Sequence, residues 1–214
     1  MPKIGNVIVV GSGVAGGIIA RGLARAGAES VTVIEAGPAI PMRNYRKWLD
    51  LMATGVAPYD SYLDSVADYE NDGPQDLVLL NSRLMVHGGT TVHWDGCCPR
   101  LAPEDFEKKS RTGIGADWPL SYAQLEKYFE MSEKIIGVSG DWKRSHVPRA
   151  NPFPLPALAP SRMDQEFING CEKLNWESEQ VPIARHVVPY HGRPACQSTG
   201  TCRYCPVGGR FSGD

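Results

Sequence analysis

Three glycines near the start of the chain have the spacing of a phosphate-binding turn. Residues 11–16 read Gly-Ser-Gly-Val-Ala-Gly, with glycine at the first, third and sixth positions. In such a turn Gly11 permits the tight bend, Gly13 lets the backbone approach a pyrophosphate, and Gly16 lets a helix pack close to a sheet. The helix N-terminus then offers N–H groups and partial positive charge to the phosphates. The turn therefore predicts dinucleotide binding.

A carboxylate follows the turn at the distance expected for a ribose ligand. Glu35 lies 35 − 16 = 19 residues after Gly16, close to the roughly 20 residues typical of the acid that binds ribose hydroxyls. An acid here disfavours a 2′-phosphate, so FAD or NAD is favoured over NADP. The alternative is a glycine-rich turn that binds nothing, with Glu35 exposed to solvent.

The elements that must position these residues can be inferred from periodicity. Residues 6–10 and 31–35 are β-branched runs, and a helical pattern extends from the turn to Ala26. Strand, turn, helix, strand and acid together predict an α/β chain with a Rossmann-like fold that binds FAD or NAD. Residues 38–73 lack strand–helix alternation, so the fold is expected to be incomplete in this chain.

A second glycine-rich segment is a candidate for contact with the cofactor. An apolar stretch over 76–86 leads into Gly88-Gly89-Thr90-Thr91, and His93 follows closely. The two glycines permit close backbone approach, and the two hydroxyls can donate to phosphate or flavin carbonyls. We therefore expect residues 83–98 to contact a flavin.

Three cysteines near the end of the chain form a candidate metal site. Cys196, Cys202 and Cys205 lie within ten residues, a clustering unlike a disulfide framework. Three thiolates match a three-iron four-sulfur cluster, whereas zinc would need a fourth ligand from His186 or His191. Reduced structural thiols are the third interpretation. The other three cysteines are expected to be small buried residues: Cys97, Cys98 and Cys171.

Composition narrows the function classes. The 214 residues are 42% hydrophobic and 21% charged with a net charge of −2, which is typical of a soluble globular protein. The balance gives no basic stripe for a nucleic-acid backbone, so no nucleic-acid partner is expected. The apolar stretch over 7–20 is broken by four glycines, which argues against a secretion signal.

The rest of the chain shows two helix signals and one extended stretch. Ser121 with Gln124, and Ser161 with Asp164, are N-caps followed by helical spacing. Residues 179–187 are expected to be a strand. Five prolines between 148 and 160 keep that stretch extended, as a linker or as a wall across the domain. We thus expect an FAD-binding region over 1–137, a linker over 138–160 and a partial second region over 161–214.

Together these segments resemble a known family. The residue 11–16 turn with Glu35, the run Gly-Gly-Thr-Thr-Val-His-Trp at 88–94, and the run Gly-Ala-Asp-Trp-Pro-Leu-Ser-Tyr at 115–122 resemble the glucose-methanol-choline (GMC) flavoprotein oxidoreductases. The helix that follows is similar as well. The resemblance covers most of residues 5–137, and the subgroup resembles bacterial sugar and polyol dehydrogenases.

The resemblance implies an FAD that accepts hydride from an alcohol, sugar or polyol and passes electrons to a carrier such as a cytochrome subunit. His93 matches the histidine that bonds covalently to flavin in some relatives; otherwise it packs near the flavin. Similar dehydrogenases carry a three-iron four-sulfur cluster, with three residues between the second and third cysteines where this chain has two.

The same resemblance places the catalytic base, a histidine, near the end of a chain more than twice this long. No residue here matches it, so we expect a partial enzyme. Relatives reach the periplasmic face of the inner membrane together with a small subunit that carries the secretion signal, so the resemblance implies the same location for this chain. The alternative location is the cytoplasm. Two alternatives are a catalytically silent dinucleotide-binding module and an NAD-linked reductase with a zinc site.

Overall fold

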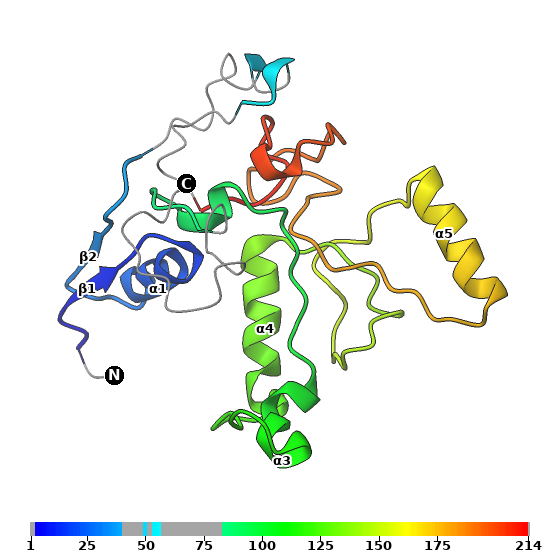
Figure 1. Ribbon diagram of the computed structural model, residues 1–214. Helices are drawn as coiled ribbons and strands as arrows, with labels where there is room; N and C mark the ends of the chain where they lie inside the picture. The colour runs from blue at the N-terminus through cyan, green and yellow to red at the C-terminus, as the bar shows by residue number, and fades with distance from the viewer. Residues whose placement is uncertain (1–2, 40–48, 51–52, 57–82, 214) are drawn as a thin grey trace. The chain divides into compact units, whose positions relative to one another are not determined.

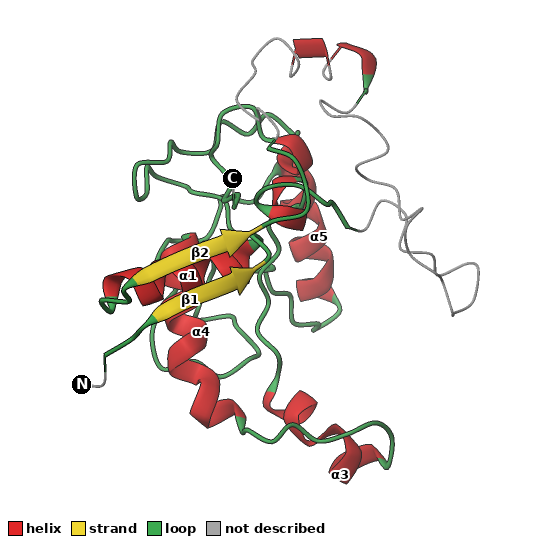
Figure 2. Cartoon of the chain, turned by 90° about the vertical axis from the view of Figure 1, so that its left-hand side faces the viewer, coloured by secondary structure: helices red, strands yellow, loops and turns green. Residues whose placement is uncertain are grey.

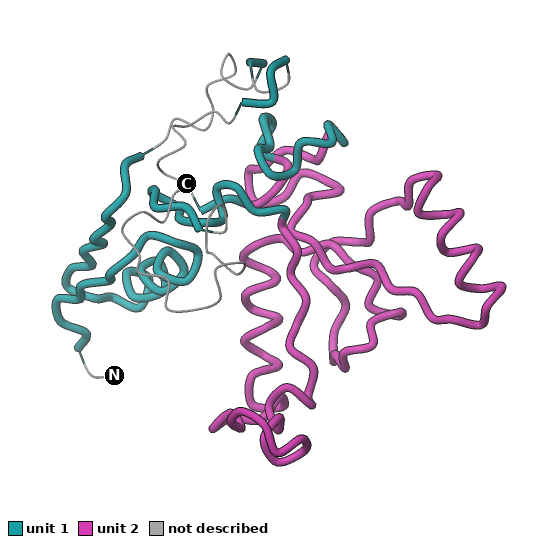
Figure 3. The backbone as a smooth tube through the Cα atoms, viewed as in Figure 1, with its two compact units in different colours: residues 1–95, 198–208, 212–214 teal, residues 96–197, 209–211 magenta. Residues whose placement is uncertain are grey.

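The computed structural model describes residues 3–39, 49–50, 53–56 and 83–213, and the chain divides into two compact units (Figure 3). Unit 1 comprises Met1–Asp95, Ser198–Gly208 and Ser212–Asp214, and unit 2 comprises Gly96–Gln197 and Gly209–Phe211. These units do not follow the expected segments 1–137, 138–160 and 161–214. The chain passes from unit 1 to unit 2 within the first segment, and it returns to unit 1 at the cysteine loop.

The described part of unit 1 contains a two-stranded parallel sheet and one long helix (Figure 1). Strand β1 (Asn6–Val10) pairs with β2 (Ser30–Ile34), in the register Asn6 to Ser30 through Val10 to Ile34. Helix α1 (Val14–Arg25) connects them, and Figure 2 shows both strands pointing the same way beside it. The strand–helix–strand prediction is therefore confirmed, and the chain is mixed α/β.

One face of this sheet is apolar and exposed. Val9 is buried, whereas its neighbours Ile8 and Val10 are 65% and 82% exposed because alternate residues of a strand point to opposite faces. On β2, Ile34 is 51% exposed. Parallel sheets are normally covered on both faces, so this face is suited to packing against further structure.

Unit 2 is built around helix α4 (Tyr122–Ile136). Ser121 and Gln124 form the expected capping box, and Gly137 ends the helix with a left-handed conformation at φ 82°. Tyr122 packs with Phe106 and Val147 in a buried cluster. Tyr128 is 51% exposed, because it lies one position away from Phe129, which packs against this cluster.

Shorter elements precede α4, and one longer helix follows it. Two 3-10 helices, η3 (Gly89–Val92) and η4 (Pro103–Glu107), come before helix α3 (Lys108–Thr112). Helix α5 (Arg162–Lys173) begins at the expected Ser161–Asp164 capping box and buries Cys171, as expected. Cys98 is only half-buried and Cys97 is exposed, so the expectation of a buried residue was wrong for Cys97. A third 3-10 helix, η5 (Cys202–Tyr204), lies in the cysteine loop.

The proline-rich stretch is packed into unit 2. Phe153 and Leu155 are 8% and 4% exposed, and Leu155 pairs with the backbone next to Ser139. Residues 138–160 therefore form a wall of the unit, not the solvated linker that the proline content suggested.

Residues 179–187, expected as a strand, form only isolated bridges. Ile183 pairs with both Cys97 and Ser139, and Arg185 pairs with Arg210. Pro182 has no N–H to donate, and its neighbours meet three unrelated segments, so no continuous ladder forms. The apolar run at 77–80 lies outside the described residues. Among the described residues, no helix is long and apolar enough to cross a membrane.

Candidate functional site

The glycine turn between β1 and α1 has the geometry of a phosphate-binding turn. A Cβ on Gly16 would lie 2.0 Å from the carbonyl oxygen of Gly11, so only glycine fits where the helix begins. A Cβ on Gly13, in contrast, would have no atom within 4 Å. No side chain caps the N-terminus of α1, and its first turn carries no acidic residue. The turn thus leaves open space beside helix N–H groups, as a bound phosphate requires.

Glu35 is hydrogen-bonded to this turn. Its Oε2 accepts from the backbone N–H of Ser12 at 2.8 Å and from the Ser12 hydroxyl at 2.7 Å, and its Oε1 accepts from the N–H of Gly37 at 2.9 Å. Partial burial opposes ionisation, but these hydrogen bonds outweigh it and lower the pKa of Glu35. The ionised carboxylate therefore orders the turn, while its ribose contact stays a prediction.

Ser12 also joins the turn to the second glycine-rich segment. The Ser12 hydroxyl accepts from the backbone N–H of Gly88 at 3.1 Å, across 76 residues of sequence. Ser12 is 8% exposed. Sequence reasoning missed this residue, although its place inside the glycine motif, with a hydroxyl that can donate and accept at once, was the available signal.

The segment from Gly88 to His93 is a tight turn against the glycine motif. Gly88 has φ 87°, a left-handed conformation that glycine adopts without strain, and a Cβ on Gly89 would lie 3.2 Å from the Cα of Gly13. Thr91 is buried, and its hydroxyl donates to the Gly88 carbonyl at 2.8 Å. The exposed Thr90 accepts from the N–H of Leu84 at 3.4 Å. The two predicted cofactor segments are therefore in contact within unit 1.

The C-terminal parts of unit 1 hold the same segment. The N–H of Gly213 donates to the Thr91 hydroxyl at 3.0 Å. Nη2 of Arg203, in η5, lies 3.3 Å from Nδ1 of His93. His93 is buried, with 4% of its surface exposed. The predicted residues Gly11, Gly13, Gly16, Glu35, Gly88, Gly89, Thr91 and His93 thus lie within one unit, together with part of the cysteine loop.

The structure does not show the three cysteines of the loop gathered as a metal site. Cys196 belongs to unit 2, where its N–H donates to the His186 carbonyl and its Sγ lies 3.2 Å from Nη2 of Arg185. Cys202 and Cys205 belong to unit 1. Within the described ranges, no three His, Cys, Asp or Glu side chains gather to hold a metal ion. The described residues therefore do not support the expected iron–sulfur cluster, and the zinc alternative gains no support either.

A buried ion network occupies the centre of unit 2. Glu133 accepts from Nε and Nη2 of Arg100 at 2.8 and 3.0 Å, and from Nη1 and Nη2 of Arg149 at 3.1 and 2.8 Å. Burial opposes ionisation of Glu133, but the two guanidinium groups lower its pKa. Arg100 also donates to the Tyr122 hydroxyl at 3.0 Å. Every charge is paired internally, so the network is structural.

Three side chains cap the C-terminal end of α4. The Tyr190 hydroxyl donates to the Lys134 carbonyl at 2.9 Å, and Nη2 of Arg193 donates to the Ile135 carbonyl at 3.1 Å. Nε2 of the fully buried His186 lies 3.1 Å from the Ile136 carbonyl. A carbonyl only accepts, so Nε2 carries the proton of His186. Burial, the largest cause, lowers the pKa of His186.

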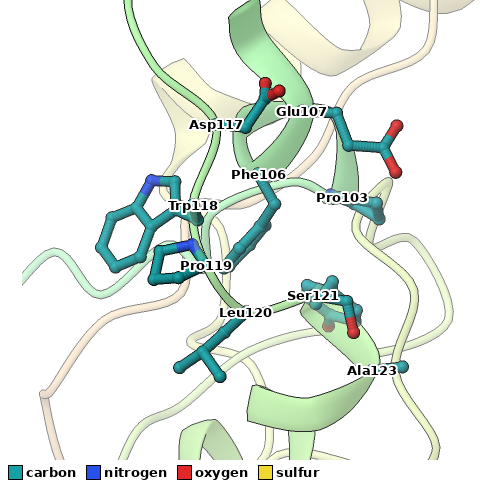
Figure 4. A pocket seen from close by; sticks show the side chains of 10 residues that line it. Pro103, Phe106, Glu107, Asp117, Trp118, Pro119, Leu120, Ser121 and Ala123 are labelled. Atoms are coloured by element: carbon teal, nitrogen blue, oxygen red, sulfur yellow. The ribbon is translucent and has the colours of Figure 1, made fainter. Parts of the chain in front are cut away.

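Unit 2 also contains an open groove of about 480 Å³. Its wall includes Trp118 and Pro119, which belong to the run at 115–122 that resembles the GMC family. Figure 4 shows the rings of Phe106 and Pro119 at the centre of the groove, with the carboxylates of Asp117 and Glu107 at one rim. Asp117 accepts hydrogen bonds from the backbone and hydroxyl of Ser110. The groove is lined by rings and by a carboxylate already bound to the protein.

The homologues of this chain are GMC-type oxidoreductases, which match it at modest identity over most of its length. No family model matches the chain.

Three named relatives illustrate the similarity. The fructose dehydrogenase large subunit of Gluconobacter japonicus is 29% identical over 97% of this chain and 42% of its own. The 2-methyl-1,2-propanediol dehydrogenase of Mycolicibacterium austroafricanum is 31% identical over 91% of this chain and 36% of its own. The gluconate 2-dehydrogenase flavoprotein of Pantoea cypripedii is 26% identical over 94% and 38%. The chain thus spans about two fifths of these relatives' length.

Proposed function

We propose that this chain is the FAD-binding part of a GMC-type oxidoreductase that oxidises a CH–OH group of an alcohol, sugar or polyol. The observation that carries the proposal is the hydrogen-bonded union of the glycine turn, Glu35 and the Gly88 segment through Ser12. This hydrogen bonding joins two segments 76 residues apart, one of which would hold the phosphates of FAD and the other of which would contact its flavin. The names of the relatives support the reaction class.

The chain's own residues bind and orient the cofactor in this proposal. The strand, turn and helix are the first part of a Rossmann-like fold, in which the α1 N-terminus and the open space at Gly13 receive the pyrophosphate. Glu35 holds the turn in shape through Ser12 and meets the ribose. Thr91 and Ser12 fix the Gly88–His93 segment against the turn. When bound, the flavin supplies the hydride acceptor.

The names of two relatives suggest what kind of partner the protein has. One is a large subunit and another is called a flavoprotein, so we propose assembly with further subunits that accept electrons from the flavin. The described residues of the cysteine loop do not gather as metal ligands, so electron transfer through this loop is not part of the proposal.

The test uses the purified protein encoded by the whole gene. We expect flavin absorbance at one FAD per chain, and reduction of an artificial dye with at least one member of a panel of sugars, polyols and short diols. Acid precipitation separates the two roles of His93, because a covalent flavin stays with the pellet and a bound one is released.

Two results would contradict the proposal. Bound NAD without flavin would indicate a reductase. Full FAD loading without reduction of the flavin by any alcohol would indicate a silent binding module.

A further inference from the structure

The cysteine loop reaches the flavin-contacting segment through one side chain. Arg203 is the middle residue of η5, and its Nη2 lies 3.3 Å from Nδ1 of His93, 110 positions away in sequence. Both residues belong to unit 1. The contact therefore links a segment rich in cysteine to the histidine that follows the Gly-Gly-Thr-Thr run.

Elementary hydrogen-bond chemistry assigns the proton on His93. All polar hydrogens of an arginine guanidinium are donors, and the group accepts nothing. Nδ1 of His93 must then be the acceptor, so the ring is neutral and carries its proton on Nε2. A doubly protonated ring would have no lone pair for Arg203 and would place two cations side by side.

Backbone hydrogen bonds hold the main chain at His93 in place. The N–H of His93 donates to the Thr90 carbonyl at 3.1 Å, closing the end of η3. The same short element is tied to the glycine turn by Gly88 and to the C-terminal segment by Gly213. His93 is therefore held by its backbone on one side and by Arg203 on its ring.

We infer that Arg203 is a positioning residue that keeps His93 as a neutral Nε2–H donor beside the cofactor site. The inference rests on the proposed function only in that the group receiving this hydrogen bond is the flavin or its substrate. Arg203 itself acts through His93. The consequence is that His93 presents an N–H dipole to the site rather than a positive charge.

The test reads the imidazole directly and needs no turnover. In protein with ¹⁵N-labelled histidine, long-range ¹H–¹⁵N spectra distinguish the two neutral tautomers from the cation, and a His93→Gln variant identifies the His93 signals among those of the other histidines. We expect the Nε2–H pattern for His93 in the parent protein. Arg203→Met should lose this pattern and give mixed tautomers, and Arg203→Lys should restore it in part.

The matched control is Arg162→Met at an exposed position of α5, which should leave the His93 signals unchanged. Arg203→Met should retain FAD at one per chain but shift the flavin midpoint potential, with Arg203→Lys intermediate. An Nδ1–H or cationic His93 in the parent protein, or an unchanged pattern in Arg203→Met, would overturn the inference. The expected tautomer in a protein that binds no flavin would instead refute the proposed function and leave the Arg203 assignment standing.

Discussion

Two carboxylates, Glu35 in unit 1 and Glu133 in unit 2, are both held ionised by hydrogen bonds, but their surroundings differ. Glu133 is 6% exposed and receives four hydrogen bonds from two arginines. Glu35 is partly exposed, and it accepts hydrogen bonds from the backbone N–H groups of Ser12 and Gly37 and from the Ser12 hydroxyl. No cation in these contacts neutralises it.

The difference separates a structural group from a binding group. Around Glu133 the arginines neutralise the charge, and Glu126 lies 4.0 Å from Arg100 as a second anion, so the cluster is complete. Around Glu35 the carboxylate orders a turn whose helix N–H groups and open space are left for a ligand. Neutralisation by neighbouring arginines is thus the mark of the structural carboxylate, Glu133. The binding carboxylate, Glu35, is marked by an ordered turn beside open space.

The largest expected effect is on the complete cluster. Glu133→Gln removes the charge that neutralises two buried guanidinium groups, and breaking a buried ion pair typically costs about 3–5 kcal/mol. Urea unfolding of the variant should show this loss. Glu130→Gln on the same helix, which removes a carboxylate bonded to the exposed Asn151 side chain, is the control and should change stability by less than about 1 kcal/mol. Equal effects would contradict the structural role of Glu133.

A second pair of variants tests the turn. Gly16→Ala places a Cβ 2.0 Å from the Gly11 carbonyl oxygen, and overpacking of this kind costs about 1–3 kcal/mol. Its neighbour Gly17, also in α1, has no atom within 4 Å of a built Cβ. Gly17→Ala should therefore be neutral or stabilise the helix by up to about 1 kcal/mol. The unfolding temperature and FAD retention should both fall in Gly16→Ala. In Gly17→Ala, FAD retention should be unchanged and the unfolding temperature should be unchanged or raised.

The comparison is sharpened by removing the exposed carboxylate. Glu35→Ala should weaken FAD binding by about 1–3 kcal/mol, because the turn loses charge-assisted hydrogen bonds, while unfolding without FAD changes less than in Glu133→Gln. Fluorescence titration of the apoprotein with FAD measures the first effect. Glu29→Ala, which removes an exposed partner of Lys3, is the control. Wild-type affinity in Glu35→Ala would refute the assignment.

The smallest effect concerns two histidines of unit 2 with opposite pKa shifts. Burial lowers the pKa of His186, so the unfolded state binds more protons and stability is lost as pH falls below about 6.5. The hydrogen bond to Glu179 raises the pKa of the exposed His146, so its contribution is lost as pH rises above that value. Unfolding between pH 5 and 8 should lose its acid slope in His186→Gln and keep it in His146→Gln.

Local elements of the fold could be predicted from the sequence, because they depend on residues close together in the chain. The two strands, the glycine turn and the capping boxes at Ser121 and Ser161 are of this kind. The Arg203–His93 contact spans 110 positions, and no local pattern encodes it. Assigning the three cysteines to one loop assumed that proximity in sequence means proximity in space, and the chain instead divides between units inside that loop.

Glu133 is an intermediate case. It follows Phe129 by one helical turn, and Phe129 packs against the buried cluster of unit 2, so a carboxylate on that face required a buried cation. Helical spacing was the available signal for this buried carboxylate, but it does not say which of the chain's arginines pair with it.

The three capped carbonyls at the end of α4 also determine how that part of the molecule opens. Helix ends normally fray one residue at a time, but here Tyr190, Arg193 and His186 each bond a successive carbonyl. The last turn of α4 cannot unwind without breaking all three, so it opens together with residues 186–193 as one cooperative unit. We therefore expect the amide hydrogens of this irregular loop to exchange as slowly as those of the last turn of α4.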